Sequence, residues 1–160
     1  MTELFERTLE LDLDCSPETV FRHIATEFFQ NHPRWDTDIA ELTQTSTGPV
    51  AMGTTGREVR EVSGRRFISE FRIVEFEPGR AFALQTTAGA MAENAEYRIR
   101  QGTSGSHLTL HVHIFPRNPL LWLMAPVIRP QIRRNFEANV ARFEAILRGL
   151  GEPRPSVPAR

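Results

Sequence analysis

The alternation of apolar and polar residues predicts a strand at the start of the chain and a long helix near its end. Residues 5–13 alternate strictly, which is typical of a half-buried β-strand. Residues 118–148 repeat apolar side chains at helical spacing. Asn118 and Pro119 have the residue types of a helix start, and Gly149 that of a helix stop. The apolar stripe of this helix comprises Leu121, Ala125, Ile128, Ile132, Phe136, Phe143 and Ile146.

Between these two elements the pattern predicts a short helical region followed by strands. Ser16 and Pro17 indicate a helix start, and apolar residues follow at helical spacing as far as Phe28. The sequence Asn-His-Pro at 31–33 predicts the helix end, and a short turn around Trp35 follows. Six further strands are predicted, at about 39–46, 53–62, 65–76, 80–87, 92–100 and 107–115.

The order of these elements predicts an α+β fold of the helix-grip type. The strand connections are short, so the sheet should be antiparallel. We expect a seven-stranded curved antiparallel sheet wrapped around the long C-terminal helix, with one or two short helices after the first strand. A chain of 160 residues fits one domain, predicted at 1–150. The proline-rich residues 151–160 are predicted to be a disordered tail.

Turn positions allow the residues on the inner face of the sheet to be predicted. With Ser63-Gly64 and Pro78-Gly79 as hairpin tips, the expected partners are Glu58 with Ser69, Arg60 with Phe67, Phe71 with Thr86, Ile73 with Leu84 and Glu75 with Phe82. One face then carries Phe67, Phe71, Ile73, Phe82 and Leu84, together with the polar Glu58 and Arg60. These two charges either reach water at the rim of the sheet or give polarity to a pocket.

Three uncharged polar residues are also predicted to face the interior. Tyr97 alternates with outward-facing residues of its strand, and its hydroxyl needs a partner. Asn135 and Asn139 lie one turn apart on the apolar stripe of the last helix. A buried amide without a hydrogen bond costs about 1–3 kcal/mol. The asparagines therefore contact protein partners, water or a ligand.

The first turns of the long helix differ from the remainder. Pro126 and Pro130 predict a kink. Leu120, Leu123 and Val127 point away from the apolar stripe. Such residues suit a gate or membrane-touching lid, or a contact between two copies of the chain.

The chain has five histidines, a residue type that often binds metal ions. His107, His111 and His113 share one face of a predicted strand, and their spacing can hold a metal. That face is opposite the apolar one, and acidic residues of the first strand could be their partners. We therefore predict no metal site. His23 and His32 fit helix-surface and turn positions.

Composition excludes several function classes. The net charge of −1 gives no basic face for nucleic acid. All 19 Lys and Arg positions are Arg, which excludes a lysine nucleophile. Cys15 is the single cysteine and is expected to be a packed thiol in a cytoplasmic protein. The apolar run from Pro119 to Ile128 is too short for a membrane span. No phosphate-binding loop or nucleophile elbow is present, so we predict no cofactor and assign no catalytic residue.

Several motifs resemble the START-like (SRPBCC) superfamily and, within it, the polyketide cyclase/dehydrase family. They are SPETVFRHIA, HPRWD, GPVAMGTTGR, RIVEFEPGRAFAL and NVARFEAIL, and the resemblance covers residues 4–148. It implies a hydrophobic cavity between sheet and C-terminal helix that binds a lipid, polyketide or steroid-like molecule. It also implies that Trp35 lies near the cavity mouth. The predicted ligand-binding residues are Trp35, Glu58, Arg60, Phe71, Phe82, Tyr97, Asn135 and Asn139.

Two functions fit these residues. The chain could be a polyketide cyclase/aromatase-like enzyme, in which Arg60, Glu58 and Tyr97 polarise carbonyl groups or move protons. Alternatively, it could be a non-catalytic carrier or sensor of a hydrophobic ligand. A homodimer through the apolar start of the last helix is a further expectation. The sequence pattern does not decide among these functions.

Overall fold

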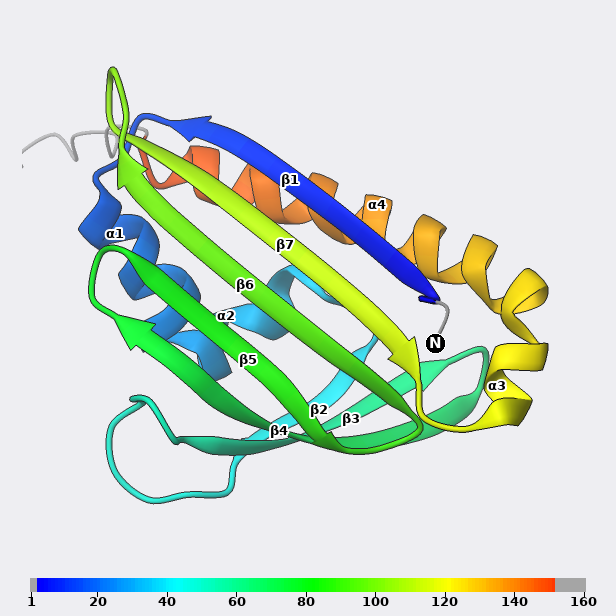
Figure 1. Cartoon of the computed structure of the whole chain (residues 1–160). Helices are drawn as coiled ribbons and strands as arrows, with labels where there is room; N and C mark the ends of the chain where they lie inside the picture. The colour runs from blue at the N-terminus through cyan, green and yellow to red at the C-terminus, as the bar shows by residue number, and fades with distance from the viewer. Residues whose placement is uncertain (1–2, 152–160) are drawn as a thin grey trace, which may run out of the picture.

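The computed structural model describes residues 3–151 as a curved antiparallel sheet that holds a long helix (Figure 1). The sheet has seven strands in the order β1-β7-β6-β5-β4-β3-β2. The predicted α+β helix-grip fold is therefore confirmed. The strands are β1 (Phe5–Leu13), β2 (Ile39–Gln44), β3 (Thr55–Val62), β4 (Arg65–Glu77), β5 (Ala81–Ala88), β6 (Met91–Gln101) and β7 (Ser106–Pro116).

Three helical segments follow β1, and two form the C-terminal part. The first three are α1 (Pro17–Phe21), a π-helical segment η1 (Arg22–Thr26) and α2 (Phe28–Trp35). The prediction that this region ends at residues 31–33 was wrong, because α2 continues through Pro33 to Trp35. The Trp35 ring packs on Phe143 with 4.9 Å between ring centroids. Burial of this ring on the core offsets the backbone hydrogen bond that proline cannot make.

The C-terminal helix is divided into α3 (Pro119–Leu123) and α4 (Ala125–Gly149). The predicted start is confirmed, since the Asn118 side chain accepts a hydrogen bond of 2.8 Å from the Leu121 amide. The break falls at Met124, just before the predicted kink positions. Pro126 occupies the first turn of α4, where its missing N–H has little cost.

Most of the predicted strand register is confirmed. Glu58 lies opposite Ser69, Arg60 opposite Phe67, Phe71 opposite Thr86 and Ile73 opposite Leu84. The pairing of Glu75 with Phe82 was wrong, because the register shifts between Ile73 and Glu75. Phe76 therefore lies opposite Phe82, and apolar rather than charged atoms meet there. Phe67 lies opposite Arg60 on the predicted face, but it is 42% exposed, so this face is not buried at Phe67.

The interior has a fully buried half, which we call the filled half, and a half whose apolar side chains remain partly accessible. Helices α1 and α2 lie beneath one end of the sheet, and α3 lies at the opposite end (Figure 1). The filled half contains the fully buried side chains Val20, Ile24, Phe28, Ile73, Phe82, Leu108 and Leu147. The other half, which we call the open half, includes the half-buried Ile114, Ile128, Ile132, Phe136 and Val140. Apolar side chains on the predicted inner stripe of α4 therefore remain partly accessible before Phe143.

Candidate ligand-binding site

A group of polar side chains, which we call the polar cluster, comes from three elements around the interior. Its members are Asp36, directly after α2, Glu58 and Arg60 of β3, and Glu93 and Tyr97 of β6. The Arg60 guanidinium donates hydrogen bonds of 3.0 and 2.6 Å to the two Asp36 carboxylate oxygens. It also donates to Glu58 Oε1 at 2.5 Å. The Arg60 side chain nevertheless keeps 25% of its surface accessible, enough for a further molecule to contact it.

The Asp36–Arg60 pair is held in its charged form. Burial alone would raise the pKa of Asp36, but Arg60 and His32 lower it below its usual value, and a hydrogen bond with Asn139 adds to this effect. Burial alone would lower the pKa of Arg60, but the carboxylates of Glu58, Asp36 and Glu93 raise it above its usual value. The expectation that Glu58 and Arg60 simply reach water at the rim of the sheet is therefore incomplete, because these charges bond to each other and are partly enclosed.

Sequence analysis missed two members of the cluster, Asp36 and, on β6, Glu93. Within the described residues, the Glu93 carboxyl group has neither a hydrogen bond nor an ion pair. Burial raises its pKa to about 7; Arg60 opposes this shift, whereas Glu58 and Asp36 reinforce it. The alternation in β6 contained the signal, because Glu93 has the same phase as the buried Ala95 and Tyr97.

Tyr97 faces the interior as predicted and is buried. Its ring packs on Phe82 with 5.6 Å between centroids and on Phe143 with 6.4 Å. Burial, with the negative charges of Glu93 and Asp36, raises the pKa of Tyr97 above its usual value. The phenol therefore stays protonated. Its hydroxyl has no hydrogen-bond partner among residues 3–151, so it can donate to a bound molecule.

Both interior asparagines of α4 have protein partners. The Asn135 amide donates a hydrogen bond of 2.9 Å to Asp38. The Asn139 side-chain oxygen accepts from Arg142, which also donates to the Trp35 carbonyl at 2.9 Å. These contacts tie α4 to the end of α2 and the start of β2. The two amides remain half-buried, so protein contacts do not cover them completely.

Three of the predicted aromatic lining residues belong to the filled half. Trp35 is buried between α2 and α4, against Phe143. Phe71 and Phe82 each pack against Phe28, at 5.6 Å between ring centroids. Phe82 is 0% exposed, so a ligand would reach it only after a neighbouring side chain moved. The direct contact predicted for Phe82 therefore needs rearrangement, and these rings support the wall around the cluster.

The prediction of surface positions for His23 and His32 was wrong. Both side chains are largely enclosed, and burial lowers the pKa of each. The Asn31 amide donates a hydrogen bond of 3.1 Å to the His23 carbonyl and lies 3.3 Å from His23 Nδ1. His23 lies on the inner side of η1, and His32 on α2, which continues to Trp35 instead of ending in a surface turn.

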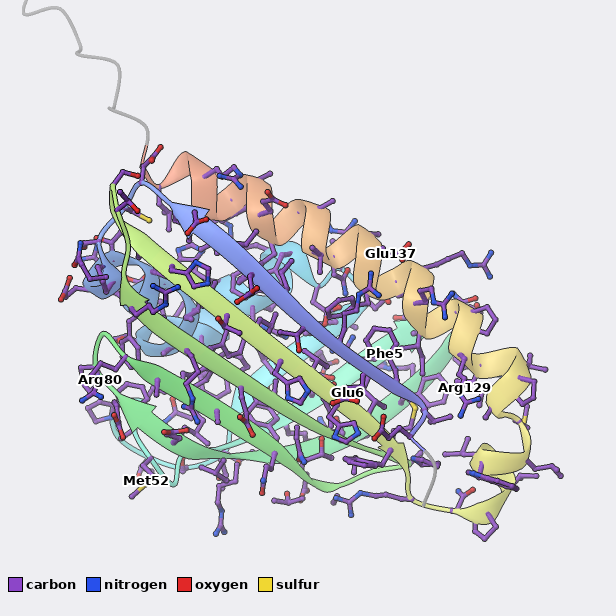
Figure 2. All side chains as sticks on the ribbon, turned by 45° about the horizontal axis from the view of Figure 1, so that its top comes forward. Phe5, Glu6, Met52, Arg80, Arg129 and Glu137 are labelled. Atoms are coloured by element: carbon purple, nitrogen blue, oxygen red, sulfur yellow. The ribbon has the colours of Figure 1, made fainter. Side chains whose placement is uncertain are left out.

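Two surface grooves lie where β1 and α4 run side by side. One has a volume of about 380 Å³ and is lined by Glu3 to Arg7 with Arg129 and Arg133. The second, of about 330 Å³, is lined by Arg7, Thr8, Leu9, Phe136, Glu137 and Val140. Figure 2 shows Phe5 on the β1 side and Glu137 on the α4 side of this region. No member of the polar cluster lines either groove. The second groove is lined in part by Phe136 and Val140, which belong to the open half.

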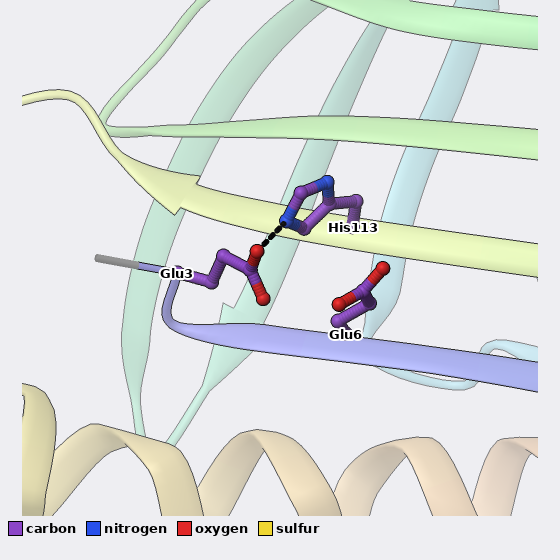
Figure 3. A group of neighbouring side chains, drawn as sticks. All are labelled: Glu3, Glu6 and His113. Carbon is purple, nitrogen blue, oxygen red and sulfur yellow. Dashed lines mark ion pairs between the residues drawn. The ribbon is translucent and has the colours of Figure 1, made fainter. Parts of the chain in front are cut away.

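The histidines of β7 face outward and meet acidic residues at the start of the chain, as expected for their side of the sheet. His107 lies 2.7 Å from Asp12, and His111 lies 2.9 Å from Glu6. His113 lies 3.1 Å from Glu3 and close to Glu6 (Figure 3). Glu3, Glu6 and His113 present ligand-type atoms within 4.8 Å of one another. Each of these imidazoles has a carboxylate neighbour, and the absence of a metal site stays a prediction.

The comparison with protein-family models identifies the family. The model described as polyketide cyclase/dehydrase and lipid transport matches residues 5–148. The chain belongs to this family. An uncharacterised protein of Mycobacterium tuberculosis is 30% identical over 149 residues, with 88% of this chain and 83% of that protein covered. An uncharacterised protein of Mycobacterium bovis matches with the same values.

Solved structures of the same fold support the architecture. A Thermus thermophilus protein matches with a TM-score of 0.71 and 13% identity, covering 92% of this chain and 100% of that one. A START superfamily protein of Mycobacterium smegmatis matches with a TM-score of 0.64 and 13% identity, covering 91% and 97%. At this identity the likeness establishes the fold alone. The family and the fold together support binding of a hydrophobic ligand.

Proposed function

We propose that the chain binds an uncharged, mainly apolar molecule in the open half, with one polar group of that molecule at the polar cluster. The observation that carries this proposal is the position of Arg60, Glu93 and Tyr97 on the inner face of the sheet. The α4 helix faces the same interior, and its apolar side chains before Phe143 remain partly accessible. A polyketide, sterol or neutral lipid combines these two chemical requirements, because each has a large apolar surface and few polar groups.

The charges of the cluster favour a neutral ligand over an acid. Asp36 and Glu58 both bond to the single guanidinium of Arg60, and the nearby Glu93 adds negative charge whenever it ionises. A ligand carboxylate or phosphate would therefore meet excess negative charge in a partly desolvated place. A ketone or hydroxyl oxygen could instead accept from Tyr97, Arg60 or protonated Glu93.

Two dyes with related ring systems test this proposal directly. N-phenyl-1-naphthylamine is neutral, and 8-anilinonaphthalene-1-sulfonate adds a negative charge. We expect the neutral dye to bind roughly tenfold more tightly, corresponding to about 1.4 kcal/mol. Fluorescence titration at pH 8 measures both affinities.

A pair of α4 variants localises the dye. Ile132→Trp adds bulk on the half-buried stripe of α4 and should abolish binding, whereas Ala138→Trp adds it at an exposed position and should leave binding unchanged. Circular dichroism verifies that both variants are folded. Failure of the neutral dye to bind, or equal effects of the two tryptophans, would contradict the proposal.

A second candidate function, cyclase-like catalysis, is favoured specifically by Glu93. Its pKa of about 7 suits a group that both accepts and donates protons at neutral pH. With a ligand carbonyl oxygen at Tyr97 or Arg60, the Glu93 carboxylate would remove a proton from the adjacent carbon. The resulting enolate would attack a second carbonyl of the same molecule, and Glu93 would return the proton to the new alkoxide. This step forms one carbon–carbon bond without an oxidant or reductant.

The domain bounds, the cellular location and the absence of other partners are also proposals or predictions. We propose a single domain over residues 1–150, which includes the family match at residues 5–148. Of the tail predicted at 151–160, residues 152–160 lie outside the described part of the chain. Among the described helices, none has the length and hydropathy required to cross a membrane. A cytoplasmic location, the absence of nucleic-acid binding and the absence of a cofactor stay predictions.

A further inference from the structure

The segment that joins β7 to α4 exposes a concentrated group of large apolar side chains. Five of them lie within eight residues and form what we call the apolar patch: Leu120, Trp122, Leu123, Met124 and Val127. Leu123 and Val127 are 71% and 73% exposed, and the Trp122 ring is half exposed. Asn118 caps α3 and so fixes the start of the segment in this projecting position. Such a concentration of exposed apolar side chains indicates an interaction surface.

The charged residues of the segment that carries the apolar patch are all positive, although Glu3 and Glu6 line the same groove as Arg129 and Arg133. Residues 117–136 contain four arginines, Arg117, Arg129, Arg133 and Arg134, and no Asp, Glu or Lys. Within residues 3–151, none of these four forms an ion pair with a carboxylate. Arg117 and Arg129 instead donate hydrogen bonds of 2.7 Å to the backbone carbonyls of Thr86 and Glu3. The guanidinium groups keep donors for a partner that supplies negative charge.

We propose that the apolar patch and these arginines bind the surface of an anionic lipid bilayer. Exposed leucine and tryptophan side chains can enter the boundary between headgroups and acyl chains, while arginines pair with lipid phosphates. A symmetric pair of chains explains the surface less well, because a two-fold contact places the same positive residues near one another. The short apolar segment limits binding to the interface, in agreement with the absence of a spanning helix among the described residues.

The position of the apolar patch suggests a role for membrane binding in ligand exchange. The patch lies on α3 and the first turn of α4, and α3 lies at one end of the sheet (Figure 1). Ile114 and Ile128 of the open half are close to it along the chain. A protein docked through α3 would hold the open half next to the bilayer, so that an apolar ligand could move between them without crossing water. This use rests on the proposed ligand binding, but membrane binding itself does not. A vesicle experiment therefore tests the surface independently of any ligand.

Sedimentation with vesicles of phosphatidylcholine, alone or with one quarter phosphatidylglycerol, measures the binding. We expect the full chain to sediment with the anionic vesicles only, and 0.5 M NaCl should weaken this association. Arg133→Gln with Arg134→Gln should weaken it roughly 20-fold, and Leu123→Glu with Val127→Glu should abolish it. The matched controls Arg65→Gln with Arg72→Gln, and Phe67→Glu with Ile68→Glu, change exposed residues elsewhere and should bind as wild type does.

Tryptophan fluorescence identifies the face that touches lipid. Trp122 is exposed and Trp35 is buried, so brominated lipids should quench only the Trp122 emission. Equal binding to both vesicle types, or retained binding by the Leu123→Glu/Val127→Glu variant, would overturn the proposal. A wild-type dimer that Leu123→Glu dissociates, with no vesicle binding, would assign the patch to a second copy of the chain instead.

Discussion

The Asp36→Ala variant is expected to lower the free energy of unfolding by about 3 kcal/mol, because it leaves Arg60 without its bidentate partner. Asp36 is almost fully enclosed, and its carboxylate accepts from both terminal nitrogens of Arg60. Removing one partner of such a pair has a larger effect than removing an exposed pair. The partial exposure of Arg60 and its remaining bond to Glu58 place the expected loss at the lower end of the usual range. Urea denaturation at pH 7 measures it.

An exposed ion pair supplies the control for Asp36. Glu41 lies 2.9 Å from Arg66, and its side chain is 55% exposed. Glu41→Ala should therefore change stability by less than about 1 kcal/mol. Equal losses for Asp36→Ala and Glu41→Ala would show that the Asp36–Arg60 pair is no more important than a surface contact.

The Glu93→Gln variant is expected to be more stable than wild type at pH 8 and to lose that advantage at low pH. The pKa of Glu93 is about 7 in the folded chain, against 4.5 for an ordinary glutamate. The folded state therefore keeps a proton that the unfolded state has released. Wild type should lose stability as the pH rises from 4.5 through 7, by about 2 kcal/mol, while the glutamine variant lacks this loss. The comparison is made from urea denaturation at half-unit steps of pH.

Glu96→Gln is the matched control for Glu93. Glu96 lies three residues along the same strand but on the exposed face. Its side chain is half exposed, so its replacement should change stability by less than about 1 kcal/mol. Subtracting each variant from wild type removes the contributions of the ionisable groups that all three proteins share. A Glu93→Gln difference that stays constant between pH 5 and pH 8 would mean that Glu93 is ionised throughout.

The fold could be predicted from sequence because its signals are local. Hydrophobic alternation located every strand, and the two-residue turn at Ser63-Gly64 fixed the partners of Glu58 and Arg60. The bulge between Ile73 and Glu75 was not predicted, because the expected pairing was counted from the turn as a regular ladder without an extra residue. The extension of α2 through Pro33 was also missed. It depends on packing between Trp35 and Phe143, which are far apart in sequence.

The site was predictable only in part, for a similar reason. The inward phase of Arg60 and Tyr97 follows from their strands, but the partner of Arg60 does not. Asp36 follows a helix whose end was misplaced, so its contact with β3 is a property of the tertiary structure. Glu93 was missed although it has the same phase as Ala95 and Tyr97, because it lies only one residue after the predicted start of its strand.

The most direct test of ligand binding is native mass spectrometry of the chain purified from its own host without detergent. We expect a population heavier than the polypeptide by the mass of an uncharged apolar molecule, which organic solvent extracts. Ile132→Trp should lose this population, and Ala138→Trp should keep it. Repeated observation of the bare polypeptide, or an equal bound population in both variants, would contradict binding in the open half.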